Sequence, residues 1–404
     1  MSNLIGRREL LGGLALLASV PGCGTSSPPP TTPPGAPALP ALAPLAEATF
    51  ERRFDRLRTL ARDAGASVVF VSSGTTSFAY LAGAKVERSE RLIALIVPVE
   101  GDPFLVAPAF ELERMRRQTR IRALRPWEER ESPYAVVRDA LGTGHANPRI
   151  LIEPHTEYQA AQALAHALPG AALVDGTAAF EQLRLRKDDE ELARIRRAVA
   201  VTQDVFDATF AALRPGLRDR EISDAIADQF KRAGYEGYAL VQFGALSALP
   251  HGRPDGQALR EGTVVLIDGG CAVDGYWSDI TRTHWFGGAR SAEFAKVYDV
   301  VHDAQSAAIA CARPGVAAQD VDRAARAVID KAGYGPYFTH RLGHGLGMDG
   351  HEPAYMVEGN IQRLEPGFVF TVEPGIYLPG KFGVRIEDDV VCGVDGAIML
   401  SRRA

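Results

Sequence analysis

Strand-like and helix-like patterns of apolar residues alternate along the first half of the chain. Apolar runs rich in β-branched residues predict strands at 66–73, 91–99, 102–108, 148–154 and 171–176. Amphipathic stretches around them predict helices at 50–65, 109–119 and 156–170. Strands that alternate with helices build α/β domains, so we expect such a domain, with a mixed or parallel sheet, over residues 48–179.

The pattern changes near residue 180, where helices and strands follow one another in longer runs. A long amphipathic helix is predicted within 184–216, where Pro215 and Gly216 stop it, and a second helix within 218–237. A further helix pattern occupies 291–315, and strand patterns appear at 263–270, 277–287, 367–378 and 383–391. Helices that flank antiparallel strands are typical of the α+β class, which we predict for residues 180–404.

Length and composition are those of a globular protein with more than one domain. A domain takes roughly 100–200 residues, and the chain has 404, of which 46% are hydrophobic and 24% are charged. The formal net charge of -5 lacks the basic excess of a nucleic-acid-binding surface, so we exclude nucleic acid as a partner. After the N-terminal segment no run of about 18 apolar residues occurs, which argues against a membrane span there.

The start of the chain has the pattern of an export signal (1–23) followed by a Pro-rich tether (24–47). Arg7 and Arg8 precede a short apolar run that ends in "VPGC" at Cys23, which resembles a twin-arginine signal with a lipobox. We therefore expect an exported protein, periplasmic or at the cell surface, with Cys23 lipidated; a plain secretory signal cut nearby is the alternative. The other cysteines have no disulfide or metal spacing and are expected to be buried apolar residues: Cys271, Cys311 and Cys392.

The strand predicted at 383–391 carries charged residues at every second position. Arg385, Glu387 and Asp389 would therefore point to one face of an otherwise apolar strand. A solvated sheet face explains such a stripe in an ordinary strand. A face that looks into a functional site is the alternative, and the other acidic residues of the same domain decide between the two.

Two further carboxylates belong to one predicted hairpin. Asp274-Gly275 is a hairpin turn signal between the strands that contain Asp268 and Asp279. A turn there places Asp268 opposite Thr281 and diagonal to Asp279 on the same face, with Cα atoms about 7–8 Å apart. Carboxylates that close repel each other unless a positive charge lies between them. A surface hairpin that happens to carry two acids is the simpler alternative for this feature alone.

Histidines and one more carboxylate occur where the backbone can approach a ligand closely. His340, His344 and His351 lie in a glycine-rich segment, and His344 has a glycine on each side. Glu373 ends an apolar strand directly before Pro374, where an unpaired carboxylate is costly. A lone histidine is more often an ordinary core or surface residue, but the flanking glycines favour a site.

Together these positions offer carboxylates and one imidazole from a single domain: Asp268, Asp279, His344, Glu373 and Glu387. An excess of oxygen ligands with a single nitrogen suits Mn²⁺, Fe²⁺ or Co²⁺ rather than a thiolate zinc site. This set is larger than one open catalytic ion needs, and it fits two ions that share bridging carboxylates. We therefore predict a dinuclear metal centre.

The chain from about residue 183 to about residue 400 resembles the metal-dependent peptidases of the pita-bread fold, in particular the Xaa-Pro branch of aminopeptidase P, prolidase and bacterial Xaa-Pro dipeptidases. The segments that carry the resemblance, in family order, are "PHGRPDGQALREGTVVLIDGG", "GYWSDITRTH", "GHGLGMDGHE", "LEPGFVFTVEPGIYLPG" and "FGVRIEDDV". "FAYLAGA" and "DPFLVAP" resemble the companion N-terminal domain more loosely. The resemblance implies an α+β chain in which a pita-bread catalytic domain (180–404) follows a smaller α/β creatinase-like domain (48–179). It also implies a homodimer.

The resemblance implies a role for each site residue. The ligands of two divalent ions would be Asp268, Asp279, His344, Glu373 and Glu387, with Asp279 and Glu387 bridging. Mn²⁺ is the expected ion, with Co²⁺, Fe²⁺ or Zn²⁺ as alternatives. His251 and His351 would contact the substrate or the developing oxyanion, and Arg385 would lie near the site. Asp389 has a supporting part or none.

The implied activity is hydrolysis of the N-terminal Xaa-Pro bond of a peptide or dipeptide. The nitrogen of proline in a peptide has no hydrogen to donate, so a hydrolase that relies on an extended substrate's N–H groups handles this bond badly. Two metal ions would instead activate a bridging hydroxide and polarise the scissile carbonyl. Glu373 would carry the water's proton to the leaving nitrogen, and His351 or His251 would donate to the oxyanion.

Three other functions are weighed against this one. A metal-independent relative such as creatinase is disfavoured, because that branch lacks the metal ligands that this chain has. A non-peptidase metalloenzyme of the same fold, such as a lyase acting on a small sulfonium acid, would have the same ligands. A surface-tethered binding protein with a degenerate site is disfavoured by the intact ligand set.

Overall fold

The computed structural model describes residues 42–145, 147–250, 252 and 255–403. The predicted export signal with Cys23, the tether up to residue 41 and His251 lie outside the described residues, so these interpretations stay predictions. Within the described part, no helix is both long and apolar enough to cross a membrane.

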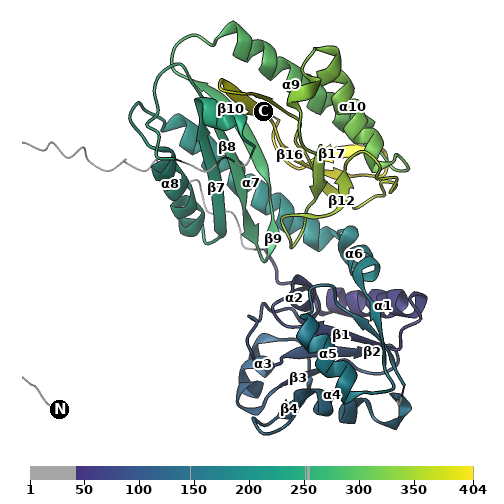
Figure 1. Ribbon diagram of the computed structural model, residues 1–404. Coiled ribbons are helices and arrows are strands. Elements are labelled where there is room, and N and C mark those ends of the chain that lie inside the picture. The colour runs from purple at the N-terminus through teal and green to yellow at the C-terminus, as the bar shows by residue number, and fades with distance from the viewer. Residues whose placement is uncertain (1–41, 146, 251, 253–254, 404) are drawn as a thin grey trace, which may run out of the picture. The chain divides into compact units, whose positions relative to one another are not determined.

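The first elements form an α/β unit around one six-stranded sheet (Figure 1). Its strands are β1 (Val68–Ser72), β2 (Ala94–Pro98), β3 (Phe104–Pro108), β4 (Ala123–Trp127), β5 (Arg149–Ile152) and β6 (Ala172–Asp175). Its helices are α1 (Glu47–Asp63), α2 (Thr76–Ala82), α3 (Leu112–Gln118), α4 (Pro133–Leu141), α5 (Tyr158–Ala167) and α6 (Thr177–Leu185). The strand order is β4-β3-β2-β1-β5-β6, with β1, β2 and β3 antiparallel and the other neighbours parallel. This mixed sheet confirms the predicted α/β class.

Apolar side chains cover both faces of this sheet, because successive strand residues point to opposite sides. Val69 and Val71 of β1 pack in one cluster with residues of α1, α2 and α6. Val68 and Phe70 pack in a second cluster with residues of α4 and α5. Burial on both faces explains why the inner strands β1, β2 and β3 are continuous apolar runs in the sequence.

The remaining elements form an α+β unit with antiparallel sheets, which confirms the predicted class. One sheet has the order β10-β8-β7 with β9 paired to β8, a second has the order β12-β11-β13-β16-β17, and β14 pairs with β15. These strands are β7 (Glu236–Phe243), β8 (Thr263–Val273), β9 (Tyr276–Trp277), β10 (Ile280–Phe286), β11 (Gly343–Gly345), β12 (Glu352–Met356), β13 (Val369–Val372), β14 (Gly375–Leu378), β15 (Phe382–Arg385), β16 (Asp388–Cys392) and β17 (Ala397–Met399).

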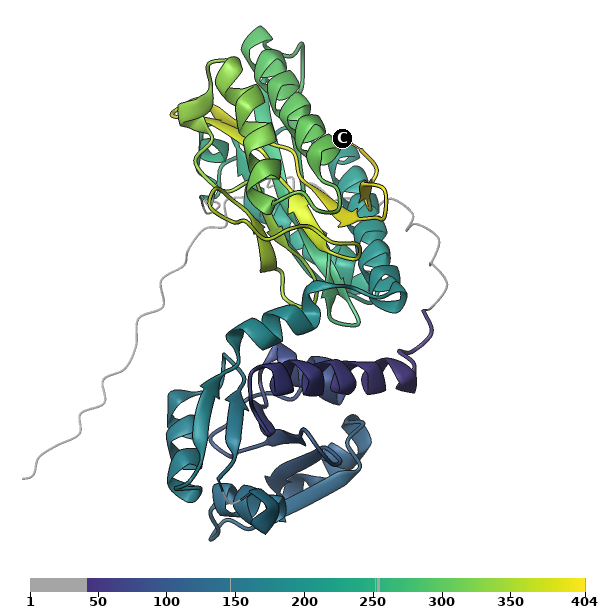
Figure 2. The same ribbon diagram turned by 90° about the vertical axis from the view of Figure 1, so that its right-hand side faces the viewer.

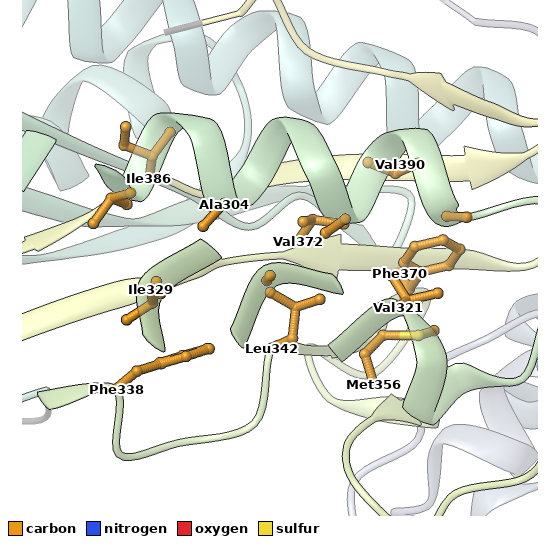
Figure 3. Packing of buried hydrophobic residues seen from close by; sticks show 14 of the residues in the cluster. Ala304, Val321, Ile329, Phe338, Leu342, Met356, Phe370, Val372, Ile386 and Val390 are labelled. Atoms are coloured by element: carbon orange, nitrogen blue, oxygen red, sulfur yellow. The ribbon is translucent and has the colours of Figure 1, made fainter. Parts of the chain in front are cut away.

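Four long helices accompany these sheets: α7 (Asp189–Ala211), α8 (Asp219–Arg232), α9 (Ala292–Cys311) and α10 (Ala318–Lys331). Helix α7 begins at a capping box in which Asp188 and Glu191 bind each other's backbone N–H groups, in keeping with the acidic start of this segment. Helices α9 and α10 lie side by side against the C-terminal strands (Figures 1 and 2). Their apolar faces share one core with strand β13, where Ala304 and Val321 lie near Phe370 and Val372 (Figure 3).

Three strands predicted as continuous are interrupted in the structure, each at an acidic residue. The segment 383–391 divides into β15 and β16 at Glu387, because the Glu387 N–H donates to the Thr281 carbonyl (3.1 Å) in another sheet. The segment 277–287 divides into β9 and β10 at Asp279, and 367–378 divides into β13 and β14 at Glu373 before Pro374. The breaks release these carboxylates from regular sheet pairing.

The described cysteines are free thiols. Cys271 and Cys392 are buried, as predicted. Cys311, near the end of α9, is only half-buried, so the interpretation as a buried apolar residue was wrong for this position.

Candidate metal centre

The hairpin of β8, β9 and β10 brings Asp268 and Asp279 together as its turn signal predicted. Asp274 and Gly275 both adopt positive φ angles (49° and 85°), which the favoured two-residue hairpin turn requires. The register then pairs Asp268 with Thr281, so Asp279, two residues earlier, is the diagonal neighbour of Asp268. Carboxylate oxygens of these two acids and of Glu387 lie within 4.8 Å of one another.

The stripe of Arg385, Glu387 and Asp389 faces this hairpin rather than solvent. All three residues are at most 3% exposed. Arg385 Nη2 donates to Asp268 Oδ2 (2.7 Å), and the Thr281 hydroxyl donates to Glu387 Oε2 (2.6 Å). Asp389 Oδ2 accepts the backbone N–H of Asp279 (3.0 Å), so Asp389 supports the position of a candidate ligand.

Strand β11 presents His344 to the same carboxylates. The His344 Nδ1 lies 3.1 Å from the Gly345 carbonyl, which fixes a proton on Nδ1 and leaves the Nε2 lone pair free for a ligand. The Nε2 atom lies 3.5 Å from Glu373 Oε1 and 3.8 Å from Asp279 Oδ2. Burial, with a smaller effect of nearby His351, lowers the pKa of His344 to about 3, so its imidazole is neutral. A neutral imidazole is the form that binds metals.

The glycines beside His344 are needed for close packing of the backbone. A β-carbon at Gly343 would lie 2.0 Å from the Thr371 carbonyl oxygen, and one at Gly345 would lie 1.9 Å from that of Pro353. Any larger residue would push β11 away from its neighbours and carry His344 out of the site. The two glycines that flank His344 are therefore required by the close packing of β11 against its neighbouring strands.

The donor atoms of the predicted ligands converge in overlapping groups. In each group the atoms lie within 4.8 Å of one another, and the groups found among the described residues are Asp268, Asp279 and Glu387; His344, Glu373 and Glu387; and Asp279, His344 and His351. Asp279, Glu387 and His344 each belong to two groups, and of these the two carboxylates have a pair of oxygens with which they could bridge two ions. His351 adds a nitrogen to one group although it was predicted as a non-ligand.

Without bound cations, ionisation of the clustered carboxylates is unfavourable. Burial raises the pKa of Glu373 to about 8. Burial, followed by the neighbouring carboxylates, raises the pKa values of Asp279 and Glu387 well above their usual range. Ionised carboxylates this close are costly unless positive charge lies between them, and their oxygen-rich donor set suits hard divalent ions. The residues therefore fit a divalent metal centre.

Several residues that support the site escaped the sequence interpretation. Tyr377 accepts a hydrogen bond from Arg385 Nη1 (2.8 Å), and its hydroxyl lies 2.7 Å from His340 Nε2. His340 thus lies beside Tyr377 rather than among the candidate ligands. The Thr371 hydroxyl accepts a hydrogen bond from the His344 backbone N–H (3.1 Å). Thr371 precedes Glu373 by two residues, and residues two apart in a strand point to the same side, so the sequence could have indicated Thr371 as a neighbour of the site.

Comparison with known proteins agrees with this geometry. Residues 193–393 match metallopeptidase family M24, and residues 53–186 match the creatinase/prolidase N-terminal domain. The chain is 37% identical over 355 residues to the putative dipeptidase YkvY of Bacillus subtilis, a match that covers 87% of this chain and 97% of that protein. The chain belongs to metallopeptidase family M24.

Two further proteins match over a similar length. An Xaa-Pro dipeptidase of Lactobacillus helveticus is 35% identical over 347 residues, covering 84% of this chain and 93% of that protein. The crystal structure of dipeptidase PepE from Mycobacterium ulcerans superposes with a TM-score of 0.83 at 33% identity, covering 90% of this chain and 98% of that chain. Membership in the M24 family confirms a pita-bread catalytic domain after a creatinase-like N-terminal domain, and it implies a metal-dependent hydrolase.

Proposed function

We propose that the protein is a dipeptidase that hydrolyses Xaa-Pro dipeptides with the help of two divalent metal ions. The observation that carries the proposal is the convergence of the donor groups, in which Asp279 and Glu387 are each shared. The 35% identity to an Xaa-Pro dipeptidase supports the choice of substrate. Hydrolysis of longer peptides with proline in the second position is the alternative.

The metal ligands we propose are Asp268, Asp279, His344, Glu373 and Glu387. Mn²⁺ is the proposed ion, because hard oxygen donors outnumber the single imidazole. The bound ions would supply an activated water and would polarise the scissile carbonyl. Arg385 holds Asp268 in place through its 2.7 Å ion pair, and Thr281 does the same for Glu387 through its hydroxyl.

Two side chains are assigned to the movement of protons and charge. Glu373, at the end of β13 and beside His344, would accept the proton of the attacking water and deliver it to the proline nitrogen. That transfer is necessary because the amide nitrogen of proline leaves as an amine. His351, whose ring centre lies 3.9 Å from that of His344, would donate a hydrogen bond to the developing oxyanion. His251 is proposed for a second contact with the substrate.

The N-terminal sequence and the family resemblance support further proposals about location and assembly. The paired Arg7 and Arg8 and the lipobox-like end at Cys23 support export by the twin-arginine route, followed by lipidation. The resemblance to Xaa-Pro peptidases supports a homodimer.

The activity is tested with three substrates: Ala-Pro, Ala-Ala and a longer peptide that begins with Ala-Pro. Purified protein loaded with Mn²⁺ should cleave Ala-Pro fastest, and Glu387→Gln should be inactive, which excludes a contaminating peptidase. Faster cleavage of the longer peptide would favour the aminopeptidase alternative. No hydrolysis of any of the three by protein that has bound its ions would contradict the proposal.

A further inference from the structure

A buried amide lies between the two chain segments that present Glu373 and Glu387. Gln305 of helix α9 is 0% exposed, and its Nε2 donates to the carbonyl oxygens of Val372 (3.2 Å) and Ile386 (3.3 Å). Val372 directly precedes Glu373, and Ile386 directly precedes Glu387. One side chain therefore connects the backbone at both strand breaks.

The same nitrogen also donates to a carboxylate on the other side of Glu387. Asp388 Oδ2 lies 3.0 Å from Gln305 Nε2, so three oxygen atoms share the two N–H bonds of one amide. Asp388 is 0% exposed and also accepts a hydrogen bond from Arg282 Nη2 (2.6 Å). Arg282 Nη1 donates in turn to the Glu387 carbonyl (2.7 Å). The backbone around Glu387 is thus held from both directions by buried polar groups.

Packing alone gives no reason for an amide at this position. The other buried residues of α9 are apolar: Phe294, Val297, Val301, Ala304 and Ala308. Figure 3 shows Ala304, the neighbour of Gln305 in the chain, in the same apolar core as Val372 and Ile386. Burial of an amide among such residues is costly unless its hydrogen bonds offset the loss of water. The Gln305 Nε2 atom donates such hydrogen bonds to the segments that carry two candidate ligands.

We propose that Gln305 is a positioning residue that sets the separation of Glu373 and Glu387 and thereby the affinity of the site for a pair of divalent ions. The proposal rests on the metal-dependent function proposed above. Gln305 acts through the backbone, because its contacts are carbonyl oxygens and Asp388 rather than the ligand side chains themselves. Replacement of residues that hold metal ligands in position typically lowers metal affinity by about 10- to 100-fold.

Gln305→Met tests the proposal, because methionine has a similar length but no N–H group. Calorimetric titration of metal-free protein with Mn²⁺ should show the two ions bound about 10- to 100-fold more weakly, with a matching loss of activity toward Ala-Pro at low Mn²⁺. Gln305→Glu should bind Mn²⁺ more weakly still, because a carboxylate would face two carbonyl oxygens and Asp388. Gln305→Asn keeps an amide but is too short to reach both carbonyls, and it provides a second test if Gln305→Met fails to fold.

Gln203→Met is the matched control. Gln203 is a buried glutamine of α7 that also binds backbone, since its Nε2 donates to the Arg402 carbonyl (2.7 Å) and its oxygen accepts the Arg402 N–H (2.9 Å). Its replacement should lower thermal stability without changing Mn²⁺ affinity. Equal Mn²⁺ affinity in Gln305→Met and Gln203→Met would overturn the proposal and leave Gln305 a purely structural residue.

Crystal structures of the metal-free wild type and Gln305→Met give a readout that does not depend on metal binding. The variant should show a larger separation between the backbones at Val372 and Ile386, and an unchanged separation would overturn the positioning role. A wild type that binds no Mn²⁺ and does not cleave Ala-Pro would instead contradict the proposed function. The two failures are therefore distinguishable.

Discussion

Removal of the divalent ions should make the stability of the protein fall as the pH rises above neutrality. Burial raises the pKa of Glu373 to about 8 in the folded protein, against a usual value of 4.5. Between these values the folded protein keeps a proton that the unfolded chain has lost. The folded state then binds more protons than the unfolded state, so the free energy of unfolding decreases with increasing pH. The pKa values of Asp279 and Glu387 are raised by burial as well and act in the same direction.

His344 has the opposite effect at lower pH. Burial lowers its pKa to about 3 from a usual value of 6.5, so the contribution of His344 to the free energy of unfolding rises with pH until about 6.5. Above that value the His344 contribution fades, and the carboxylates with raised pKa values make the free energy of unfolding fall with pH. One pH unit corresponds to about 1.36 kcal/mol, so Glu373 alone should lower the free energy of unfolding by about 2 kcal/mol between pH 6.5 and 8.

Urea unfolding followed by circular dichroism at pH 6.5, 7, 7.5 and 8 measures this change. In EDTA the wild type should lose at least about 2 kcal/mol across the series, and saturating Mn²⁺ should abolish the loss because bound cations favour the ionised carboxylates. Glu373→Gln should lessen the loss in EDTA. Glu293→Gln is the control, since Glu293 pairs with Lys381 at the surface (2.7 Å) and should leave the slope unchanged. A flat or rising curve for the metal-free wild type, or equal slopes for wild type and Glu373→Gln, would contradict a raised pKa of Glu373 in the folded protein.

Further variants test individual assignments. Asp279→Ala and Glu387→Ala should abolish hydrolysis of Ala-Pro and lower the bound metal, because each removes a carboxylate shared by two donor groups; near-normal turnover in a peptidase assay argues against the site. His351→Ala should lower kcat by about 100-fold at unchanged metal content, as the loss of one oxyanion donor does, and metal loss in elemental analysis would make His351 a ligand instead. Cys23→Ser should move the protein from the membrane to the soluble fraction of cells, and unchanged fractionation contradicts the lipoprotein signal.

Local sequence patterns were sufficient to predict which side chains of the candidate site lie side by side. The turn signal at Asp274-Gly275 fixed a register in which Asp268 faces Thr281, and the structure has that register. The two-residue period of Arg385, Glu387 and Asp389 predicted one common face, and all three contact the hairpin. The register and the common face depend on neighbours in the chain, so local strand geometry predicts them, whereas the contact with the hairpin needs the folded arrangement.

Features that depend on distant segments could not be predicted in the same way. The strand containing Glu387 looked continuous, and its break depends on a hydrogen bond to Thr281 from another sheet. The role of Gln305 depends on two carbonyls that lie 67 and 81 residues away along the chain. In the sequence, Gln305 is one polar residue of an amphipathic helix, and only the folded arrangement shows that it faces the core.

We propose that one group of side chains holds a pair of divalent ions: Asp268, Asp279, His344, Glu373 and Glu387. Elemental analysis of protein dialysed against Mn²⁺ measures the number of bound ions. We expect about two ions per chain for the wild type and a marked decrease for Asp279→Ala. Fewer than one ion per chain in folded wild-type protein would contradict it.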